Sequence, residues 1–221
     1  MNFQMLLKPL ALAAALTAAA SGAQAVTVYN TTVASTGVNL FGFGVTYDNF
    51  ALTTVGSVEV GLRARYRVRP TEASDAFGNY GPFEAGTQTA AFGSPARSDR
   101  AQWSYDFFIQ DTGAPSSNIY SLCVDGNCIN PLTFGDNRGA VATGLGNSMQ
   151  LFFAGTPGNV GYDVNAAGMH TFSLSVSDAN SVLLGSVAIS ANVVAVPEPE
   201  SYALLMSGLG VLGFLARRRK G

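Results

Sequence analysis

Apolar and polar residues alternate along two stretches of the chain. In residues 57–69 apolar side chains occupy every second position from Val58 onward, and residues 171–177 repeat the alternation. Because successive side chains of a strand point to opposite faces, a period of two is typical of a strand with one buried face. We therefore predict a long half-buried strand in each stretch, the first with a basic outer face.

Further runs are rich in β-branched and aromatic residues, and clusters of Gly, Pro, Asn and Asp separate them. These runs are residues 26–33, 38–47, 102–110, 119–124, 149–154 and 182–194. No stretch between residues 26 and 196 carries an apolar stripe of helical period. The pattern predicts an all-β fold, a single β-sandwich or jelly-roll-like domain of about eight to ten strands over residues 26–195.

One segment lacks any regular pattern. Residues 70–100 are rich in Gly, Pro, Ala and Ser, with Tyr80, Phe83 and Phe92 scattered among them. Long connections in compact domains are usually functional or mobile. We expect residues 71–98 to form a surface excursion, with one short strand near residues 87–92.

The N-terminal residues 1–25 have the layout of a signal peptide. Lys8 precedes an apolar stretch at residues 10–20 that is too short to span a bilayer, and Ala23 and Ala25 are small residues at positions −3 and −1. We expect export through the Sec machinery and cleavage by signal peptidase after Ala25. The alternative is an uncleaved helix that anchors the chain.

The C-terminal residues 196–221 combine three parts in a fixed order. The triplet Pro197, Glu198 and Pro199 stays extended, since each proline fixes φ and removes a backbone donor. An apolar run over residues 202–216 then leads to a basic cluster, which consists of Arg217, Arg218, Arg219 and Lys220.

The apolar run predicts a short transmembrane helix. Its fifteen residues would span about 22 Å, against a hydrocarbon core of about 30 Å. The basic cluster acts as a stop-transfer signal on the cytoplasmic side, which places residues 26–195 in the periplasm. The alternative is a buried core helix, which the preceding Pro-Glu-Pro-Glu linker disfavours.

This arrangement resembles the PEP-CTERM sorting domain of Gram-negative bacteria, and the resemblance is confined to the tail. It implies that an exosortase in the inner membrane recognises Pro197, Glu198 and Pro199 and cuts near them. The domain would then be released or transferred toward the cell surface. Family members commonly accompany exopolysaccharide production and biofilm formation, so the resemblance implies a structural or adhesive role for the exported domain.

Charge narrows the choice of partners. The exported region holds seven arginines, no lysine and twelve acidic residues, a formal net charge of −5. Nucleic-acid binding requires a basic footprint, so we expect no nucleic-acid partner.

The two cysteines flank a turn signal. Asp125 and Gly126 form a strong two-residue hairpin turn, which places Cys123 opposite Cys128. Paired residues of this kind lie within disulfide distance, and an exported protein meets an oxidising periplasm. We therefore predict a disulfide between Cys123 and Cys128. A metal site is the alternative, but this spacing without a second Cys or His pair is poor zinc geometry, so we expect no metal.

Four arginines point the same way from the first predicted strand. This arginine ladder consists of Arg63, Arg65, Arg67 and Arg69. Successive side chains on one face lie about 6.6 to 6.8 Å apart and could bind a repeating anionic polymer such as an acidic polysaccharide. We favour the alternative, in which the charges protect a strand edge or pair with acidic residues across the sheet.

Catalytic signals are sparse. The single histidine, His170, is expected to be an ordinary residue at the edge of a strand, and no serine-hydrolase elbow, phosphate loop or metalloprotease motif occurs. A pair of carboxylates could still serve a glycan hydrolase. The candidates for such a pair are Glu59, Glu84, Asp99, Asp106 and Asp111. We expect no catalytic residues and no cofactor; calcium binding at an Asp-containing turn has no EF-hand or repeat motif to support it.

Aromatic residues are the last candidates for ligand contact. Trp103 and Tyr105 could stack on sugar rings, but alternation places them on one face with Phe107, which predicts a core position. A carbohydrate-binding module therefore stands as the alternative to a structural or adhesive domain, and a secreted glycan hydrolase as the less favoured one.

Overall fold

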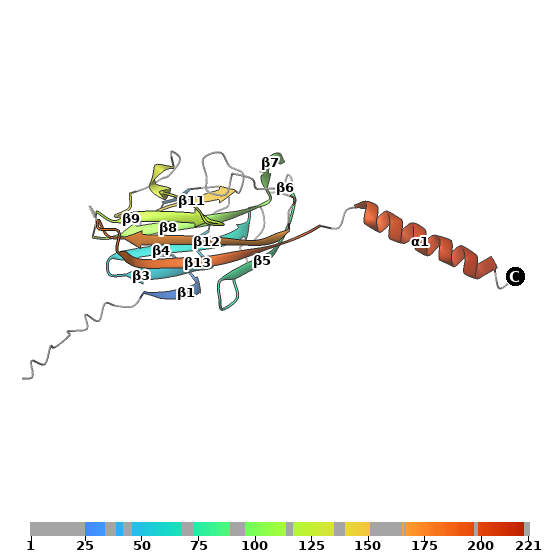
Figure 1. Ribbon diagram of the computed structural model, residues 1–221, viewed down its shortest axis with the longest axis horizontal. Helices are drawn as coiled ribbons and strands as arrows, with labels where there is room; N and C mark the ends of the chain where they lie inside the picture. Colours follow the sequence, from blue (N-terminus) through green and yellow to red (C-terminus); the bar gives the residue numbers. More distant parts are fainter. Residues whose placement is uncertain are drawn as a thin grey trace, which may run out of the picture.

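The computed structural model describes most of the chain outside the N-terminal 24 residues. The described residues are 25–33, 39–41, 46–67, 73–88, 96–113, 117–134, 140–150, 165, 167–196 and 199–218. They form two large β-sheets, a small two-stranded sheet and one α-helix that follows the last strand (Figure 1). The expectation of an all-β domain is confirmed.

The first large sheet, sheet A, has the strand order β1-β3-β4-β8-β11-β2. Its strands are β1 (Val26–Thr31), β2 (Asn39–Phe41), β3 (Phe50–Val55), β4 (Val58–Tyr66), β8 (Trp103–Asp111) and β11 (Leu145–Gln150). Neighbours are antiparallel except for β11 and β2, which run parallel. The centre of the sheet is the long pairing of β4 with β8.

The second large sheet, sheet B, has the order β10-β9-β12-β13-β5. Its strands are β5 (Asn79–Glu84), β9 (Ile119–Val124), β10 (Asn127–Ile129), β12 (Gly168–Ser177) and β13 (Leu183–Val194). Strands β5 and β13 are parallel and the other pairs antiparallel. The small sheet pairs β6 (Thr87–Gln88) with β7 (Arg97–Ala101), and a 3-10 turn at Pro131–Thr133 follows β10.

The two large sheets bury one shared core. Trp103 on β8 stacks on Phe83 of β5 at 5.3 Å and meets the edge of Phe172 on β12 at 6.0 Å between ring centroids. All three side chains are at most 1% exposed. The inward position predicted for Trp103, Tyr105 and Phe107 is thus confirmed, since each belongs to this cluster.

Sheet A differs from the prediction in having a second buried face. Strand β4 was expected to be half-buried, but its burial is nearly complete on both sides. A smaller cluster of Val33, Phe50, Leu52 and Phe108 covers the outer face. Gly61 leaves room for the side chain of Leu52, its partner on β3, because a Cβ at Gly61 would lie 2.4 Å from Leu52 Cδ2. Alternation in the sequence identifies the apolar face but does not say what covers the other one.

Most predicted strands have observed counterparts. Residues 119–124 match β9, and residues 26–33, 102–110 and 182–194 match β1, β8 and β13 to within two residues at each end. In the run 38–47 the strand is β2, and residues 42–45 lie outside the described residues. The run 149–154 overlaps only the end of β11, and residues 151–154 are also outside the described part. Strand β3 was not predicted.

The expected surface excursion over residues 71–98 is wrong in part. It contains β5, whose Tyr80 and Phe83 are 1% and 0% exposed in the core. Tyr80 lies opposite Ala191 and Phe83 opposite Val193, so two residues of β5 face Asn192 alone. This bulge breaks the period of two and turns both aromatic rings inward, which is why no alternation marks the strand. Of the short strand expected at residues 87–92, Thr87–Gln88 form β6, and residues 89–92 lie outside the described residues.

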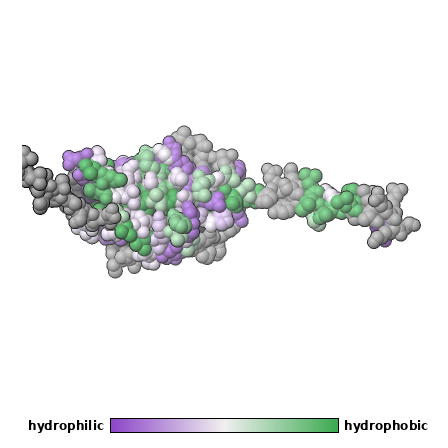
Figure 2. Space-filling view, turned by 60° about the horizontal axis from the view of Figure 1, so that its bottom comes forward, coloured by the Kyte–Doolittle hydropathy of each residue, from purple (hydrophilic) through white to green (hydrophobic). Residues whose placement is uncertain are grey.

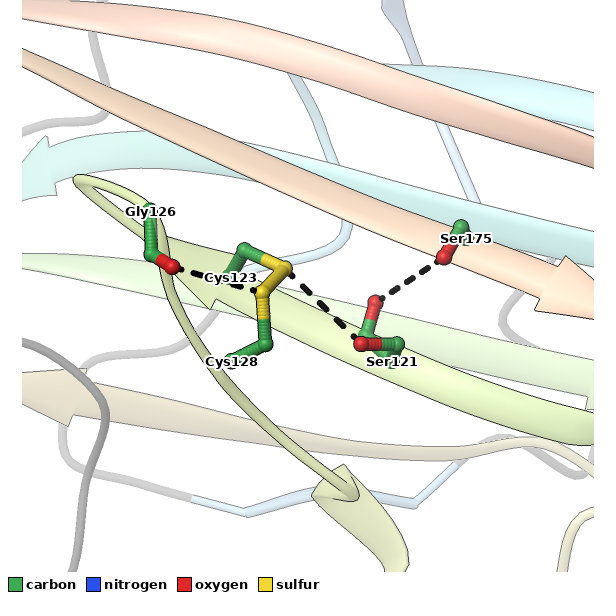
Figure 3. The surroundings of a disulfide bond; sticks show 5 residues. All are labelled: Ser121, Cys123, Gly126, Cys128 and Ser175. Carbon is green, nitrogen blue, oxygen red and sulfur yellow. Dashed lines mark hydrogen bonds between the residues drawn. A yellow bond between two sulfur atoms is a disulfide. The ribbon is translucent and has the colours of Figure 1, made fainter.

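The predicted disulfide is confirmed. Cys123 and Cys128 pair across the β9–β10 hairpin with a Cα separation of 4.0 Å (Figure 3). Asp125 and Gly126 form its turn with φ values of 49° and 83°, as a tight hairpin requires. The Ser175 hydroxyl of β12 donates to the Ser121 carbonyl at 3.5 Å. Because the closed loop is short, the bond holds the hairpin in register more than it stabilises the whole domain.

The buried position of Phe83 allows a test of β5, the strand found within residues 71–98. Replacing Phe83 with Ala should lower the free energy of unfolding by about 3–5 kcal/mol, because it removes the ring that stacks on Trp103. Phe77→Ala in the same segment is the matched control, since Phe77 is 80% exposed, and it should change stability by about 0.5 kcal/mol or less. Urea denaturation followed by Trp103 fluorescence measures both. Equal effects of the two substitutions would contradict the placement of β5.

Candidate functional site

The C-terminal helix stands apart from the sheets. Helix α1 (Pro199–Arg218) begins at Pro199, a residue well suited to the first helical turn because its missing N–H would have no partner there. Figure 1 places α1 beyond the end of β13, and the middle of the helix is mostly apolar in Figure 2. Its large apolar side chains with described surroundings are 56–73% exposed: Leu204, Leu205, Met206, Leu209, Val211 and Leu212. The helix is therefore confirmed as a helix, and those of its apolar side chains whose surroundings are described face solvent.

The predicted membrane crossing is not confirmed. Among the described residues no helix has the length and apolar character that spanning a bilayer requires. The twenty residues of α1 include Glu200 near the start and Arg217 and Arg218 at the end, which leaves a short apolar part between polar turns.

The tail residues predicted for sorting lie just after the last strand. Strand β13 ends at Val194, and Pro199 already belongs to α1. Arg217 and Arg218 form the end of the helix. Ala25, the last residue of the predicted signal peptide, is exposed and directly precedes β1. Some predicted site residues fall outside the described residues, namely Ala23, Arg69, Pro197, Glu198, Arg219 and Lys220.

The arginine ladder does not face solvent as a whole. Arg63 and Arg65 are 0% and 1% exposed, and their Nε atoms donate to the same oxygen, Oδ2 of Asp106, at 2.7 and 2.8 Å. Asp106 lies directly opposite Arg63 in the pairing of β4 with β8 and is itself fully buried. We call these three residues the Arg-Asp-Arg cluster.

The segment that precedes β3 closes over this cluster. Arg63 Nη1 donates to the carbonyl of Asp48 at 2.6 Å, and its guanidinium lies 4.5 Å from the centre of the Phe50 ring. On the other side Arg65 Nη2 donates to the Ser148 hydroxyl at 3.1 Å. The contacts correct the polyanion hypothesis for Arg63 and Arg65 and confirm the alternative of cross-strand pairing with an acidic neighbour. Of the remaining ladder positions, Arg67 lies half-buried in the turn after β4.

The cluster holds its carboxylate in the charged form. Burial alone would raise the pKa of Asp106, but the charges of Arg65 and Arg63 and a hydrogen bond from Ser148 hold that pKa below the ordinary 3.8. Burial and the adjacent charge of Arg65 lower the pKa of Arg67. Asp106 is therefore the anion that makes this concentration of positive charge inside the fold tolerable.

Two of the carboxylates considered for catalysis, Asp106 and Asp111, are held by hydrogen bonds or ion pairs within the fold. Asp111 is fully buried and accepts from the Ser57 hydroxyl at 2.8 Å, the Gly113 N–H at 3.0 Å and the Asn118 amide at 3.0 Å. Asp106 belongs to the Arg-Asp-Arg cluster. Both carboxylates thus support the sheet rather than face an open cleft.

His170 also has a structural setting. It lies near the start of β12, next to the Trp103 ring at 5.6 Å, with its Nδ1 2.7 Å from Asp125 Oδ2 in the hairpin turn. His170 is the third residue of β12 and pairs with Ala191 of β13, whereas the pairing of β12 with β9 begins only at Phe172, so the expected position at the edge of a strand is confirmed. In the described ranges no three His, Cys, Asp or Glu side chains gather as they would around a metal ion.

The Arg-Asp-Arg cluster predicts a large effect of removing its single anion. Asp106→Asn should lower the free energy of unfolding by about 3–5 kcal/mol, because two buried guanidinium groups lose their shared buried counter-charge, and Arg63 keeps a half-exposed carboxylate, Asp48 Oδ1, at 3.4 Å. Glu59→Gln on the partner strand is the control and should change stability by about 0.5 kcal/mol or less. The triple change Arg63→Met, Arg65→Met and Asp106→Leu should recover most of the loss, since it removes all three charges of the cluster. Urea denaturation separates these cases; a triple variant as unstable as Asp106→Asn would contradict the electrostatic explanation.

The lowered pKa of Asp106 predicts a loss of stability in acid. Because the folded pKa lies below the unfolded one, the unfolded state binds more protons between the two values, and stability rises with pH there. The contribution is complete above the ordinary 3.8 and is lost as pH falls through the folded pKa. Urea midpoints measured from about pH 6 down to about pH 2 should fall more steeply for the native chain than for Asp106→Asn. Parallel curves would contradict the assignment.

Comparison with known proteins adds one match. Residues 195–220 match the family model of the PEP-CTERM protein-sorting motif, the segment on which the sequence resemblance rests. No curated protein and no solved structure matches the chain. The motif implies export across the cell envelope of a Gram-negative bacterium with an exosortase as processing partner. The segment after β13 is therefore a PEP-CTERM protein-sorting motif, and it marks this chain for exosortase-directed export.

Proposed function

We propose that the chain is an exported cargo protein with a structural or adhesive role at the cell surface, from which the sorting tail is removed. The observation that carries the proposal is the position of the matched motif. It begins at residue 195, one residue after β13 ends at Val194. A cut near Pro197, Glu198 and Pro199 would remove α1 and leave every strand of both sheets in place.

The fold of the domain supports this role, because its described core does not depend on the tail. Among the residues whose burial is described, every side chain of the shared core precedes Val194. The two packed sheets fit a β-sandwich or jelly-roll-like cargo, and the disulfide suits an oxidising compartment. We infer that the signal peptide is cut after Ala25, so that the mature chain starts with β1.

The N-terminal signal peptide and the C-terminal sorting tail together indicate the export route. Sec export and signal peptidase would deliver the chain to the periplasmic side of the inner membrane, where the exposed apolar face of α1 holds it transiently near the exosortase. Release or transfer would then bring the domain to the cell surface or the extracellular matrix. By the family resemblance, the setting is a biofilm or exopolysaccharide. Contact with a glycan is the second candidate function, and a groove on sheet B favours it.

Processing of the tail can be measured directly. Intact-mass analysis of protein released by exosortase-bearing cells should give a chain that starts at Val26 and ends near Pro197, without Arg217. The triple change Pro197→Ala, Glu198→Gln and Pro199→Ala should leave the tail attached and the chain cell-bound. Ser201→Ala, just outside the triplet, is the matched control and should be processed normally. Released protein that still carries Arg219 would contradict the proposal.

A further inference from the structure

The outer face of sheet B has few charged residues along β12 and β13. From Gly168 to Val194 the one carboxylate is Asp178, in the turn between β12 and β13, and the chain has no Lys or Arg there. The outward positions of neighbouring strands hold small side chains instead. They include the paired residues Thr171 and Ser190, and Ser175 with Ser121 on one side and Ser186 on the other. The solvated face of an antiparallel sheet is polar, and here the polar side chains are short, so a ligand can approach the backbone closely.

A groove lies on this face. Its volume is about 470 Å³, within the range of about 300–1,000 Å³ that small-molecule sites occupy. The floor includes Thr171, Ser173, Ala188 and Ser190, and the rings of Tyr29 and Phe77 line it as well. None of the residues that line the groove carries a charge.

A rigid loop holds Phe77 in solvent beside the groove. Phe77 is 80% exposed, although burying such a ring is normally favourable. Asp75 Oδ1 accepts from the N–H groups of Phe77 and Asn79 at 2.8 and 2.9 Å, which closes the loop into a tight turn. Its Oδ2 accepts from the Asn79 amide at 2.7 Å. The turn is preorganised, so little conformational entropy remains to be lost when a ligand meets the ring.

Two further contacts attach this loop to both sheets. The side chain of Asn30 in β1 accepts from the Ser74 N–H at 2.7 Å, and the Ser190 N–H of β13 donates to the Gly78 carbonyl at 3.0 Å. Gly78 has a φ of +78°, and a Cβ there would lie 2.5 Å from Tyr29 Cε1. Tyr29 is thus packed directly against the loop that carries Phe77. Tyr29 and Phe77 are therefore held in place by the same set of contacts around this loop.

We propose that this groove binds an uncharged carbohydrate chain. The C–H faces of a sugar ring pack on aromatic rings, and its hydroxyl groups exchange hydrogen bonds with serine and threonine, which both donate and accept. The groove offers both aromatic rings and hydroxyl groups. None of its lining residues carries a positive charge that would bind an acidic sugar. The nearest carboxylates along the chain, Asp75 and Asp125, are occupied by local hydrogen bonds and add negative charge that disfavours an anionic ligand.

The site goes beyond the sorting function and does not depend on it. It lies on sheet B, while the sorting motif starts at residue 195. It also differs from the arginine ladder in place and in ligand class, because the ladder was a hypothesis for acidic polymers on sheet A.

Affinity electrophoresis of the full chain tests the proposal. The exposed apolar side chains of α1 call for detergent, which must be free of sugar. Native gels are cast with β-1,4-glucan, α-1,4-glucan, galactomannan or soluble chitin oligomers, and polygalacturonate serves as the acidic comparison. We expect at least one neutral polymer to retard the chain, with little dependence on salt.

Two variants locate the contact. Phe77→Ala removes the exposed ring, and Ala188→Gln fills the floor from an exposed position; each should weaken retardation about tenfold. Ser186→Gln on the same strand and Leu183→Ala, another exposed apolar residue, lie outside the groove and should match the native chain. Trp103 fluorescence verifies that each variant is folded.

Three results would overturn the proposal. The first is no retardation by any of the neutral polymers. The second is retardation that neither Phe77→Ala nor Ala188→Gln weakens. The third is retardation by polygalacturonate alone that disappears in high salt. Because the assay uses the unprocessed chain, none of these results bears on whether an exosortase removes the tail.

Discussion

Two arginines share one carboxylate on the outer face of sheet A, and the rest of that sheet is arranged around them. Buried guanidinium groups are tolerated only with a counter-charge and with partners for their remaining N–H groups. Asp106 supplies the charge from the neighbouring strand, the segment before β3 supplies the carbonyl of Asp48, and the first residue of β3 supplies the ring of Phe50. The pairing of β4 with β8 and the closure over sheet A therefore depend on each other.

This closure is tied to sheet B as well. The Tyr80 hydroxyl in β5 donates to the carbonyl of Asn49 at 2.7 Å, next to the residues that cover Arg63. The Tyr66 hydroxyl at the end of β4 accepts from the Glu84 N–H of β5 at the same distance. Strand β5 is thus a bridge between the sheets, although its own sequence resembles a loop. The domain is closed by contacts that all precede the sorting motif, which is consistent with a tail that can be removed.

Local patterns in the sequence were sufficient to predict some features of the structure but not others. The alternation around Trp103 and the Asp125-Gly126 turn are encoded within a few residues, so the inward face of β8 and the Cys123–Cys128 bond could be predicted. The burial of Arg63 could not, because it depends on Asp106, 43 residues away, and on the segment that covers both. Strand β5 was missed for a different reason. Its bulge places Tyr80 and Phe83 three residues apart on one face, which a search for a period of two rejects.

The two outer faces of the domain differ in a way that bears on function. Sheet A carries charged side chains on its outer face and covers them with polar partners before β3 and with the ring of Phe50, so its charges serve the fold. Sheet B carries small hydroxyl side chains and leaves them open beside Phe77, an apolar ring that a fixed turn keeps in solvent. Stability alone explains the first arrangement, because removing either partner would strand a buried charge. It does not explain the second, since an exposed phenylalanine on a rigid turn contributes little to folding. Contact with a ligand, as proposed for the groove, would give the second arrangement a function.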